Sequence, residues 1–369
     1  MIKEKLQKRI LTGNYRQLNT LNPKLIDFSS NDYLGFGKNK QLIGRFRQAL
    51  ETKPKLWEGT CSARLIAGNH PIFEETESYL SQVFKADACL LFNSGYTANL
   101  GVFSSVVTRF DVVLYDEYVH ASIRDGIRLS YAQAISFKHN DMDDLAQKLS
   151  SLYNKTVYVA VESLYSMDGD FCPLPELVYI CEKFGAKIII DEAHATGTSG
   201  INGLGLVENY HFEDRVFIRI HTFGKAMGAQ GAMVLGSIEL KKYLINFARP
   251  FIYTTAASPM EVLRIQLAVR FFLENPKHLK KLRKNVQYFM DIRKGVPNFL
   301  PVNSSIQCLM LQGTELEKIR VMQIQEKFSI KPILYPTVPQ EKERIRICIH
   351  SFNTKKQLDN LLKCLTLPI

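Results

Sequence analysis

Residues 187–197, KIIIDEAHATG, carry the pattern that decides the fold, an apolar run followed at once by carboxylate and imidazole side chains. The run Lys187–Ile190 places isoleucines on both faces of the predicted strand, as expected of a strand that helices cover on both sides. Ligands of such sheets bind beyond the carboxyl ends of the strands. We therefore expect Asp191 and His194 at a sheet edge where a ligand binds.

The same alternation of short apolar runs and helix-length segments extends from about residue 40 to residue 240. It predicts an α/β fold with a mostly parallel central sheet and crossover helices. The predicted strands are Ala88–Phe92, Asp111–Tyr115, Thr156–Val161, Lys187–Ile190, Val216–Ile220 and Gly231–Leu235. The predicted crossover helices are Thr97–Thr108, Ala121–Ser130, Met142–Tyr153 and Glu176–Phe184.

The length of 369 residues corresponds to about two domains. Beyond about Lys241 the pattern changes to long helices and short alternating strands, such as Ile306–Leu311 and Arg344–Ile349. We therefore predict a smaller α+β domain at the C-terminal end. The predicted division is an N-terminal arm over residues 1–40, a large α/β domain over 41–245 and the small domain over 246–369.

The composition is that of a globular enzyme or carrier, with 46% hydrophobic and 22% charged residues, and it argues against disordered, collagen-like and coiled-coil proteins. Seven cysteines without a CxxC pair or zinc-finger spacing favour reduced thiols and a cytoplasmic location. No segment reaches the ~18 consecutive apolar residues of a membrane span, and the first residues do not resemble a signal peptide. We therefore expect neither secretion nor membrane insertion.

The net charge of +11 raises the question of a polyanionic partner. No nucleic-acid-binding motif accompanies the charge, so nucleic acid is not an expected partner. The densest basic cluster consists of Lys277, Lys280, Lys281, Arg283 and Lys284. It is either a solvated helix face or a rim that attracts an anionic substrate, and the sequence leaves both interpretations open.

Several common motifs are missing from the strand ends. No GxGxxG follows a predicted strand, and Gly224-Lys225 is followed by Ala226 rather than by the hydroxyl residue of a P-loop. The HExxH zinc pattern and the GxSxG nucleophile elbow are also absent. The sequence therefore argues against dinucleotide, P-loop, zinc-protease and serine-hydrolase chemistry.

Three strand-end segments together meet the requirements of one cofactor. Taken alone, Asp191 could cap the next helix, and Lys225 in TFGKAMG could be an ordinary turn lysine. Pyridoxal phosphate needs such a lysine for its Schiff base, a carboxylate facing its pyridinium nitrogen and a helix N-terminus for its phosphate. The segment NSGYTAN (93–99) supplies that helix N-terminus. Pyridoxal phosphate is therefore the predicted cofactor, and no metal site is predicted.

The order of motifs along the chain closely resembles the α-oxoamine synthases. The matching segments are SSNDYLG (29–35), GTCSARLIAGN (59–69), NSGYTAN (93–99), HASIRDG (120–126), ESLYSMDGD (162–170), DEAHATG (191–197), TFGKAMG (222–228) and RIRI (344–347). The resemblance implies the aspartate-aminotransferase fold, known as fold type I. It also implies a homodimer with active sites at the interface, and a reaction that joins an amino acid to an acyl thioester with loss of carbon dioxide.

The resemblance assigns catalytic and cofactor roles to residues of these motifs. Lys225 would bond to the cofactor and move the substrate's α-proton, and Asp191 would keep the ring nitrogen protonated. His120 would stack on the cofactor ring. His194 and Ser166 would bond to the cofactor's phenolic oxygen or to the substrate carbonyl.

Two further groups of residues follow from the same resemblance. The phosphate-side positions are Gly95, Tyr96 and Thr222. Asn31 and Arg346 would hold the carboxylate of the amino acid, a role suited to a guanidinium group. Arg344 points to the same strand face two residues away, so the choice between the two arginines stays open.

The substrate is inferred from the segments that differ among family members. Ile252–Ala256 and Pro336–Pro339 resemble members that condense L-alanine with a pimeloyl thioester, carried by CoA or by a carrier protein, in biotin synthesis. Phe73, Thr76 and Val119 stand where the family commonly has His, Leu and Asn, and these departures bear on substrate identity. The alternatives are a sister enzyme that uses glycine or serine, and a non-catalytic binding protein of the same fold.

Overall fold

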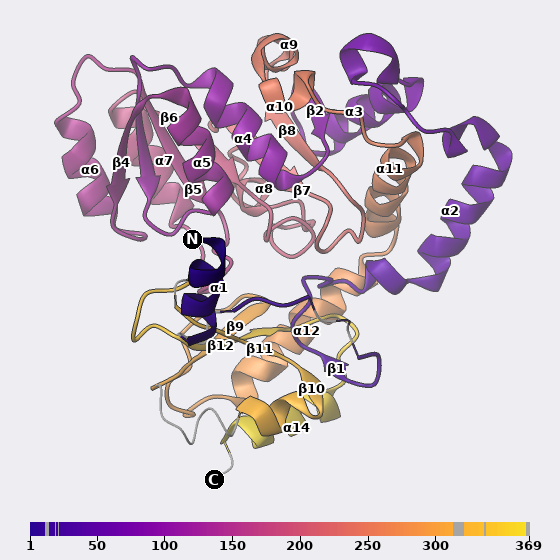
Figure 1. Cartoon of the computed structure of the whole chain (residues 1–369), viewed down its shortest axis with the longest axis vertical. Helices are drawn as coiled ribbons and strands as arrows, with labels where there is room; N and C mark the ends of the chain where they lie inside the picture. Colours follow the sequence, from indigo (N-terminus) through magenta and orange to yellow (C-terminus); the bar gives the residue numbers. More distant parts are fainter. Residues whose placement is uncertain (12–14, 19, 21, 313–320, 336, 367–369) are drawn as a thin grey trace. The chain divides into compact units, whose positions relative to one another are not determined.

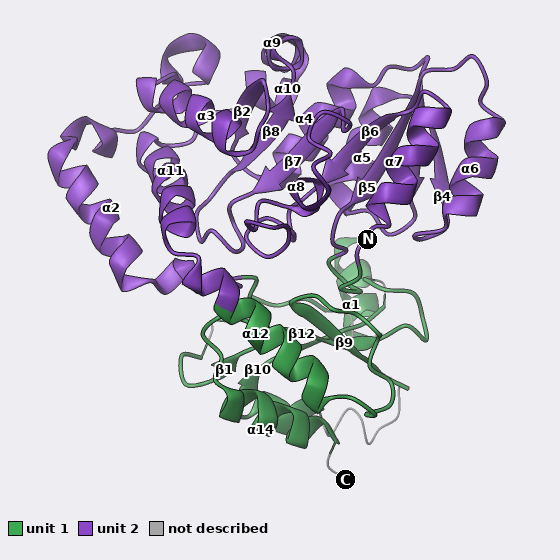
Figure 2. Cartoon of the chain, turned by 180° about the vertical axis from the view of Figure 1, so that it is seen from behind, with its two compact units in different colours: residues 1–31, 166–170, 281–369 green, residues 32–165, 171–280 purple. Residues whose placement is uncertain are grey.

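The computed structural model describes residues 1–11, 15–18, 20, 22–312, 321–335 and 337–366, so Pro336 of the 336–339 segment lies outside the described residues. The chain forms two compact units, coloured separately in Figure 2. The large unit contains residues 32–165 and 171–280. The small unit contains residues 1–31, 166–170 and 281–369.

The large unit is built on a seven-stranded sheet (Figure 1). In spatial order its strands are β2 (Ala88–Phe92), β8 (Ala232–Gly236), β7 (Ile218–Thr222), β6 (Lys187–Asp191), β5 (Val157–Glu162), β3 (Val112–Asp116) and β4 (Gln133–Phe137). The strands from β7 to β4 pair in parallel, and β8 is antiparallel to both β2 and β7. The predicted mostly parallel sheet is confirmed.

The helices of the large unit pack on the two faces of this sheet and on one another. They are α2 (Lys40–Thr52), α3 (Pro71–Val83), α4 (Gly95–Val106), α5 (Ala121–Ser130), α6 (Met142–Ser150), α7 (Leu174–Lys183), α8 (Leu206–Tyr210), α9 (Ile238–Phe247), α10 (Arg249–Ile252) and α11 (Pro259–Glu274). Ile189 packs into a core with residues of α4, α5 and α9, whereas Ile188 and Ile190 pack into a second core with residues of α6 and α7. This double burial explains why β6 is apolar on both faces.

The edge strand β4 (Gln133–Phe137) is missing from the sequence-based prediction. Gln133, Ala134 and Ser136 are exposed, and within the strand only Phe137 is buried. The prediction searched for buried apolar runs, and an edge strand with water on much of its surface lacks that pattern. β6 ends one residue later than predicted, and β7 begins and ends two residues later than predicted, so that Asp191 and Thr222 are the last residues of their strands.

The small unit combines helices with two small sheets. Its elements are α1 (Ile2–Leu11), β1 (Ile26–Asp27), β9 (Ile306–Met310), β10 (Phe328–Ser329), β11 (Lys331–Ile333), β12 (Arg344–Cys348) and α14 (Lys355–Thr366), together with most of α12 (Lys277–Ile292). β12 pairs in antiparallel fashion with β11 and β9, and β1 pairs in parallel with β10. All five residues of the predicted basic cluster are exposed on α12, which agrees with either interpretation of that cluster.

The two units have other bounds than the three predicted domains of 1–40, 41–245 and 246–369. α11 contacts α2 and α3, so residues beyond 246 belong to the large unit. The first residues do not form an independent arm, because Ile26 and Asp27 pair with Phe328 and Ser329. The packing of α11 and the pairing of β1 both join segments that are far apart in the sequence.

Two composition-based expectations can be compared with the structure. Among the described residues, no helix combines the length and the apolarity needed to cross a bilayer. All seven cysteines are free thiols, and five of them are buried. The reduced thiols agree with the prediction from cysteine spacing.

Candidate active site

Lys225 lies in a tight turn directly after β7. Its carbonyl accepts a hydrogen bond from the Gly228 amide at 3.0 Å, and the Phe223 and Gly231 backbones close the turn at 2.9 Å. Gly228 has φ +61°, and a Cβ there would come within 2.5 Å of the Gly37 nitrogen. The left-handed backbone and the close approach both require glycine. The turn is thereby held in one conformation and presents a half-buried lysine.

Asp191 ends β6, the strand next to β7, and only 5% of its surface is exposed. Its carboxylate accepts hydrogen bonds from the Asn99 side-chain amide at 2.7 Å and from the Ala193 backbone amide at 2.8 Å. On the other side of β6, Glu162 of β5 stands opposite Asp191 in the ladder. Asp191 is therefore a buried, oriented carboxylate at the predicted sheet edge.

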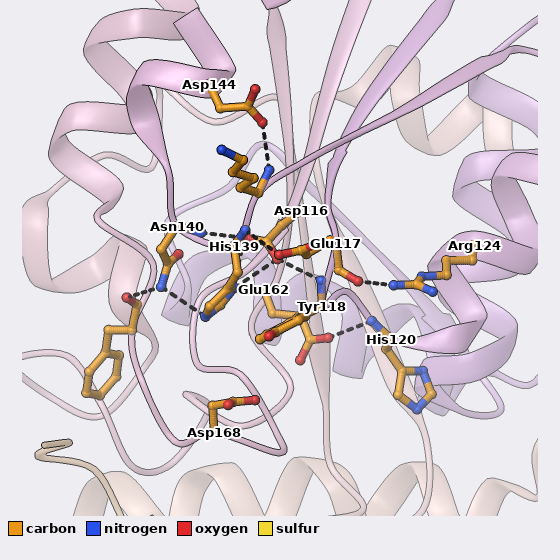
Figure 3. Close-up of polar contacts among 12 residues, drawn as sticks. Asp116, Glu117, Tyr118, His120, Arg124, His139, Asn140, Asp144, Glu162 and Asp168 are labelled. Atoms are coloured by element: carbon orange, nitrogen blue, oxygen red, sulfur yellow. Dashed lines mark hydrogen bonds and ion pairs between the residues drawn. The ribbon is translucent and has the colours of Figure 1, made fainter. Parts of the chain in front are cut away.

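His120 is the N-cap residue of α5. Its Nδ1 lies 2.8 Å from the Ser122 hydroxyl and accepts from the Ser122 backbone amide at 3.2 Å. Its backbone amide donates to the Glu162 carboxyl at 2.7 Å (Figure 3). Desolvation lowers the pKa of His120, and the Lys225 ammonium acts in the same direction against the opposing charge of Asp191.

The segment before His120 is held by Asp116, the buried last residue of β3 (Figure 3). Asp116 accepts from the Tyr118 amide at 2.8 Å, from the Asn140 amide at 2.9 Å and from His139 Nδ1 at 2.9 Å. The His139 ring stacks on Tyr118 with centroids 4.3 Å apart. These contacts fix the path of the chain from β3 to His120.

The predicted phosphate-side residues meet at the N-terminus of α4. Ser94 caps this helix, and its hydroxyl accepts from the Thr97 amide at 3.2 Å. A Cβ on Gly95 would come within 2.6 Å of Thr222 Cγ2, so the last residue of β7 lies directly against the first turn of α4. Tyr96 donates its hydroxyl to Asp125. The N-terminus of α4 is suited to an anion, because helix N-termini present backbone amides and a partial positive charge.

His194 is buried with 5% of its surface exposed. Its Nδ1 lies 2.9 Å from the Tyr33 hydroxyl, and the two rings meet edge to face at 6.2 Å. Tyr33 was missed by the sequence analysis, although it stands in the quoted segment SSNDYLG. The signal that could have identified Tyr33 is an aromatic residue with a hydroxyl group inside a polar motif.

The predicted carboxylate-binding residues lie in the small unit and contact one another. Arg346 of β12 donates from Nη2 to the Asn31 side-chain oxygen at 3.1 Å and from Nε to the Ser166 carbonyl at 2.6 Å. Arg344 forms an ion pair with Asp168. Asn31, Ser166 and Arg346 are thus brought together, while the charge of Arg344 is balanced within the small unit.

The three departures from the family pattern, Phe73, Thr76 and Val119, are all buried, and Phe73 lines a cavity. Phe73 has 1% of its surface exposed, and the Arg64 guanidinium lies over its ring at 4.4 Å. A cavity of about 270 Å³ in the large unit is lined by both of these residues and by Thr254 of the segment that suggested the substrate. Val119 is buried beside His120. None of the three residues takes part in the backbone hydrogen bonds of the Lys225 turn or in the hydrogen bonds of the Asp191 carboxylate.

Glu162 is the most perturbed carboxyl of this site and was also missed by the sequence analysis. It ends β5 just as Asp191 ends β6, so the rule that identified Asp191 applies equally to it. Burial and the nearby charge of Asp191 together raise the pKa of Glu162 to about 8, against the opposing effect of the Lys225 ammonium. Its carboxyl oxygen still accepts from the His120 amide.

We expect Glu162→Gln to change how stability depends on pH. A carboxyl with a raised folded-state pKa holds a proton that the unfolded chain has lost, so the wild type loses stability as pH rises from about 4.5 to about 8. Glutamine keeps the acceptor for His120 and cannot ionise. The variant should gain a few kcal/mol, roughly, relative to wild type between pH 5 and pH 8. Denaturant unfolding at pH 5 and pH 8 measures the difference in free energy of unfolding between variant and wild type, with exposed Glu176→Gln as control. The same difference at both pH values would contradict the prediction.

The donor set of the large unit fits pyridoxal phosphate. A half-buried lysine, a buried carboxylate and an imidazole lie at the ends of β7, β6 and β3, and a helix N-terminus stands beside Thr222. The side-chain oxygen of Asn99, beside Asp191, is buried without a hydrogen-bond partner. An amine, a carboxylate and an anion site match the aldehyde, ring nitrogen and phosphate of this cofactor.

Comparison with known proteins gives one consistent result. The aminotransferase class I and II family matches residues 23–365. An 8-amino-7-oxononanoate synthase from Emericella nidulans is 36% identical, covering 98% of this chain and 93% of that protein. One from Thermoanaerobacter pseudethanolicus is 35% identical, covering 98% and 95%.

Solved structures agree with the sequence comparison. An 8-amino-7-oxononanoate synthase from Francisella tularensis is 26% identical with a TM-score of 0.79, covering 93% of this chain and 97% of that one. A serine palmitoyltransferase from S. paucimobilis with bound PLP and myriocin has a TM-score of 0.89, covering 98% and 95%. At 24% identity the second likeness indicates the shared fold alone.

Proposed function

The chain belongs to the aminotransferase class I and II family, within it to the 8-amino-7-oxononanoate synthases, and from this premise we propose that it condenses L-alanine with a pimeloyl thioester. The products would be 8-amino-7-oxononanoate, carbon dioxide and a free thiol, and the reaction would serve biotin synthesis. Pyridoxal phosphate is the cofactor of this family. One observation carries the proposal, namely that Lys225 follows β7, Asp191 ends the adjacent strand β6 and His120 caps α5, in a chain that covers 93% of the Emericella nidulans enzyme.

Each residue of the large unit then has a defined task. Pyridoxal phosphate, when bound, withdraws electrons from the α-carbon of an attached amino acid and so stabilises negative charge there. Lys225 would supply the amine that bonds to the cofactor's aldehyde, and its Nζ would take the α-proton and return it. Asp191, held by Asn99 and Ala193, would keep a proton on the ring nitrogen. His120 would cover the ring.

The remaining cofactor contacts are proposed on the same grounds. The amides of Gly95 and Tyr96 at the N-terminus of α4, together with the Thr222 hydroxyl, would bind the phosphate. His194 and Ser166 would hydrogen-bond the phenolic oxygen or the substrate carbonyl. Tyr33, 2.9 Å from His194 Nδ1, would fix the orientation of that imidazole.

We assign the carboxylate of the amino acid to Arg346 and Asn31 rather than to Arg344. Arg346 already bonds to Asn31, the other residue predicted for this role, whereas Arg344 is engaged by Asp168. A planar guanidinium can bind a carboxylate through two parallel hydrogen bonds, which lysine cannot do. The two arginines therefore differ in what their loss should change.

We expect Arg346→Lys to raise the KM for the amino acid by roughly 10-fold to 100-fold, because a charge-assisted bidentate contact is lost. Arg344→Met should leave that KM near the wild-type value and instead lower the free energy of unfolding by about 3 kcal/mol, because Asp168 loses a buried partner. Steady-state kinetics and denaturant unfolding of both variants measure these effects. The reverse pattern would move the assignment to Arg344.

Two rival functions are separated by a substrate panel. Alanine, glycine and serine would each be assayed with pimeloyl, acetyl, succinyl and palmitoyl thioesters, with thiol release as the signal. The proposal predicts the highest kcat/KM for alanine with the pimeloyl thioester. Preference for another pair would indicate a sister enzyme, and no turnover with any pair would favour the non-catalytic alternative. Comparing pimeloyl-CoA with pimeloyl carrier protein in this assay identifies the physiological donor.

We also propose that the protein acts in the cytoplasm as a homodimer whose active sites lie at the interface. The reduced cysteines support the first part, and family membership supports the second. Sedimentation of the active enzyme tests the oligomeric state. A stable monomer with full activity would contradict the dimer.

A further inference from the structure

We propose that Asn99 and Ser122 are positioning residues that hold His120 as a neutral imidazole protonated at Nε2. The inference deepens the proposed function, on which its catalytic meaning rests. Three hydrogen bonds carry it, and they connect His120 to Asp191 through two buried side chains that the sequence analysis did not select. All four residues belong to the large unit.

The donor and acceptor of each hydrogen bond can be assigned starting from Asp191. An ionised carboxylate only accepts hydrogen bonds, so the Asn99 group facing Asp191 at 2.7 Å is the amide nitrogen. The same nitrogen lies 3.0 Å from the Ser122 hydroxyl oxygen. Its two hydrogens are therefore both used, one toward each neighbour. Asn99 has 1% of its surface exposed, so water does not compete for these bonds.

The next donors and acceptors to assign are those of Ser122 and His120. The Ser122 oxygen accepts from Asn99 and lies 2.8 Å from His120 Nδ1. The Ser122 backbone amide donates to the same nitrogen at 3.2 Å. A ring nitrogen that accepts this hydrogen bond carries no hydrogen of its own, so the Ser122 hydroxyl donates its hydrogen to Nδ1 as well. The hydrogen of the neutral ring is therefore on Nε2.

Packing of α4 against α5 holds the two positioning residues together. A Cβ at Gly126 of α5 would come within 2.7 Å of Phe103 Cβ and 3.1 Å of the Asn99 carbonyl oxygen. Only glycine permits this approach. Ser122, one turn earlier on α5, is fully buried as a result. The tautomer of His120 is thus determined by the contact between two helices.

The groups facing His120 act on its charge in both directions. Asp191 of β6 and Asp125 of α5 favour the protonated ring, whereas Lys225 of the β7 turn and desolvation lower the pKa of His120. The Tyr96 ring meets the imidazole edge to face at 6.4 Å, and Glu162 binds only the backbone amide. The two hydrogen bonds that Nδ1 accepts from Ser122 also favour the neutral ring. A neutral ring places no second positive charge beside Lys225 and offers Nε2–H as a hydrogen-bond donor.

The tautomer can be measured on the cofactor-free protein. Two-dimensional NMR of protein labelled with ¹⁵N at histidine distinguishes a ring nitrogen that carries hydrogen from one that does not, and a His120→Gln variant identifies the signal. Wild type at neutral pH should show Nδ1 without hydrogen and Nε2 with it. A cationic ring or an Nδ1-protonated ring in wild type would overturn the proposal without recourse to any other variant.

Variants then test whether the two residues are responsible. Ser122→Ala and Asn99→Ala should raise the pKa of His120 and mix its two tautomers, and Ser122→Thr, which keeps the hydroxyl, should restore the wild-type pattern. The matched control is Ser130→Ala, a buried serine of the same helix whose hydroxyl bonds to the Ile127 carbonyl. An unchanged tautomer and pKa in folded Ser122→Ala would overturn the proposal.

Activity of the loaded enzyme gives an independent readout. Ser122→Ala should lower kcat about fivefold to tenfold, the loss expected for one hydrogen bond, and shift the acid limb of the kcat/KM profile upward in pH with little change in KM for the amino acid. A merely structural role would lower thermal stability and leave the acid limb in place, which would overturn the proposal. Because the NMR signal needs no substrate, its result stands even if the alanine and pimeloyl assignment fails.

Discussion

Lys225→Ala is expected to abolish turnover, by a factor of at least about 10⁴, and to remove the covalent link to the cofactor. The reason is local, since the turn after β7 presents this amine from a backbone held by Gly228 against Gly37. Thiol release from the pimeloyl thioester measures the first effect. Borohydride reduction followed by peptide mass spectrometry measures the second, with the cofactor mass expected on the Lys225 peptide of wild type and absent from the Lys225→Ala variant.

A matched control separates this effect from a general loss of charge. Lys183 is an exposed lysine at the end of α7, and Lys183→Ala should keep both turnover and the labelled Lys225 peptide. A Lys225→Ala variant that turns over, or a reduced cofactor found on a different lysine, would remove Lys225 from its assigned role. Either result would also shift the candidate site away from the end of β7.

Asp191→Asn is expected to lower kcat/KM by at least about 10²-fold to 10³-fold. The neutral amide cannot hold the ring nitrogen in its protonated form, and it also places an amide where Asn99 now donates at 2.7 Å. Asp191→Glu should recover part of the loss, because it keeps the charge but displaces it by one methylene. Kinetics at saturating cofactor, with cofactor content measured in parallel, distinguish lost chemistry from lost binding.

The control for this substitution is Asp143→Asn, which changes an exposed carboxylate of α6. It should match wild type in kcat/KM and in cofactor content. An Asp191→Asn variant with near wild-type kcat/KM would show that the ring nitrogen is not held by this residue. That outcome would leave Glu162, opposite Asp191 in the ladder, as the carboxyl to test next.

The sheet could be predicted because its strands are buried on both faces. Ile188, Ile189 and Ile190 pack into two cores. Because both faces of the strand are buried, consecutive residues are apolar, and this run is visible in the sequence. β4 has no such run, because much of its surface faces water at the sheet edge. The bounds of the two units could not be predicted from the sequence for a different reason. It depends on α11 packing on α2 and α3 and on β1 pairing with β10, and both contacts join distant segments.

The residues whose side chains match the needs of the cofactor could be predicted from the sequence. The residues that orient them could not. A lysine and an aspartate at strand ends match a cofactor's needs on inspection. Asn99 and Ser122 are ordinary helix residues in the sequence, and their role depends on the close approach of α4 and α5 at Gly126. Arg344 and Arg346 share one face of β12, and only their partners in the fold, Asp168 for Arg344 and Asn31 for Arg346, distinguish them.

Release of carbon dioxide is the measurement that tests the proposed reaction most directly. The enzyme would be given L-alanine labelled with ¹³C at the carboxyl carbon together with a pimeloyl thioester, and carbon dioxide, thiol and the amino-ketone product would be quantified by mass spectrometry and thiol titration. The account predicts labelled carbon dioxide, free thiol and unlabelled 8-amino-7-oxononanoate in equal amounts. Thiol release without carbon dioxide, or a product that keeps the labelled carboxyl carbon, would contradict it.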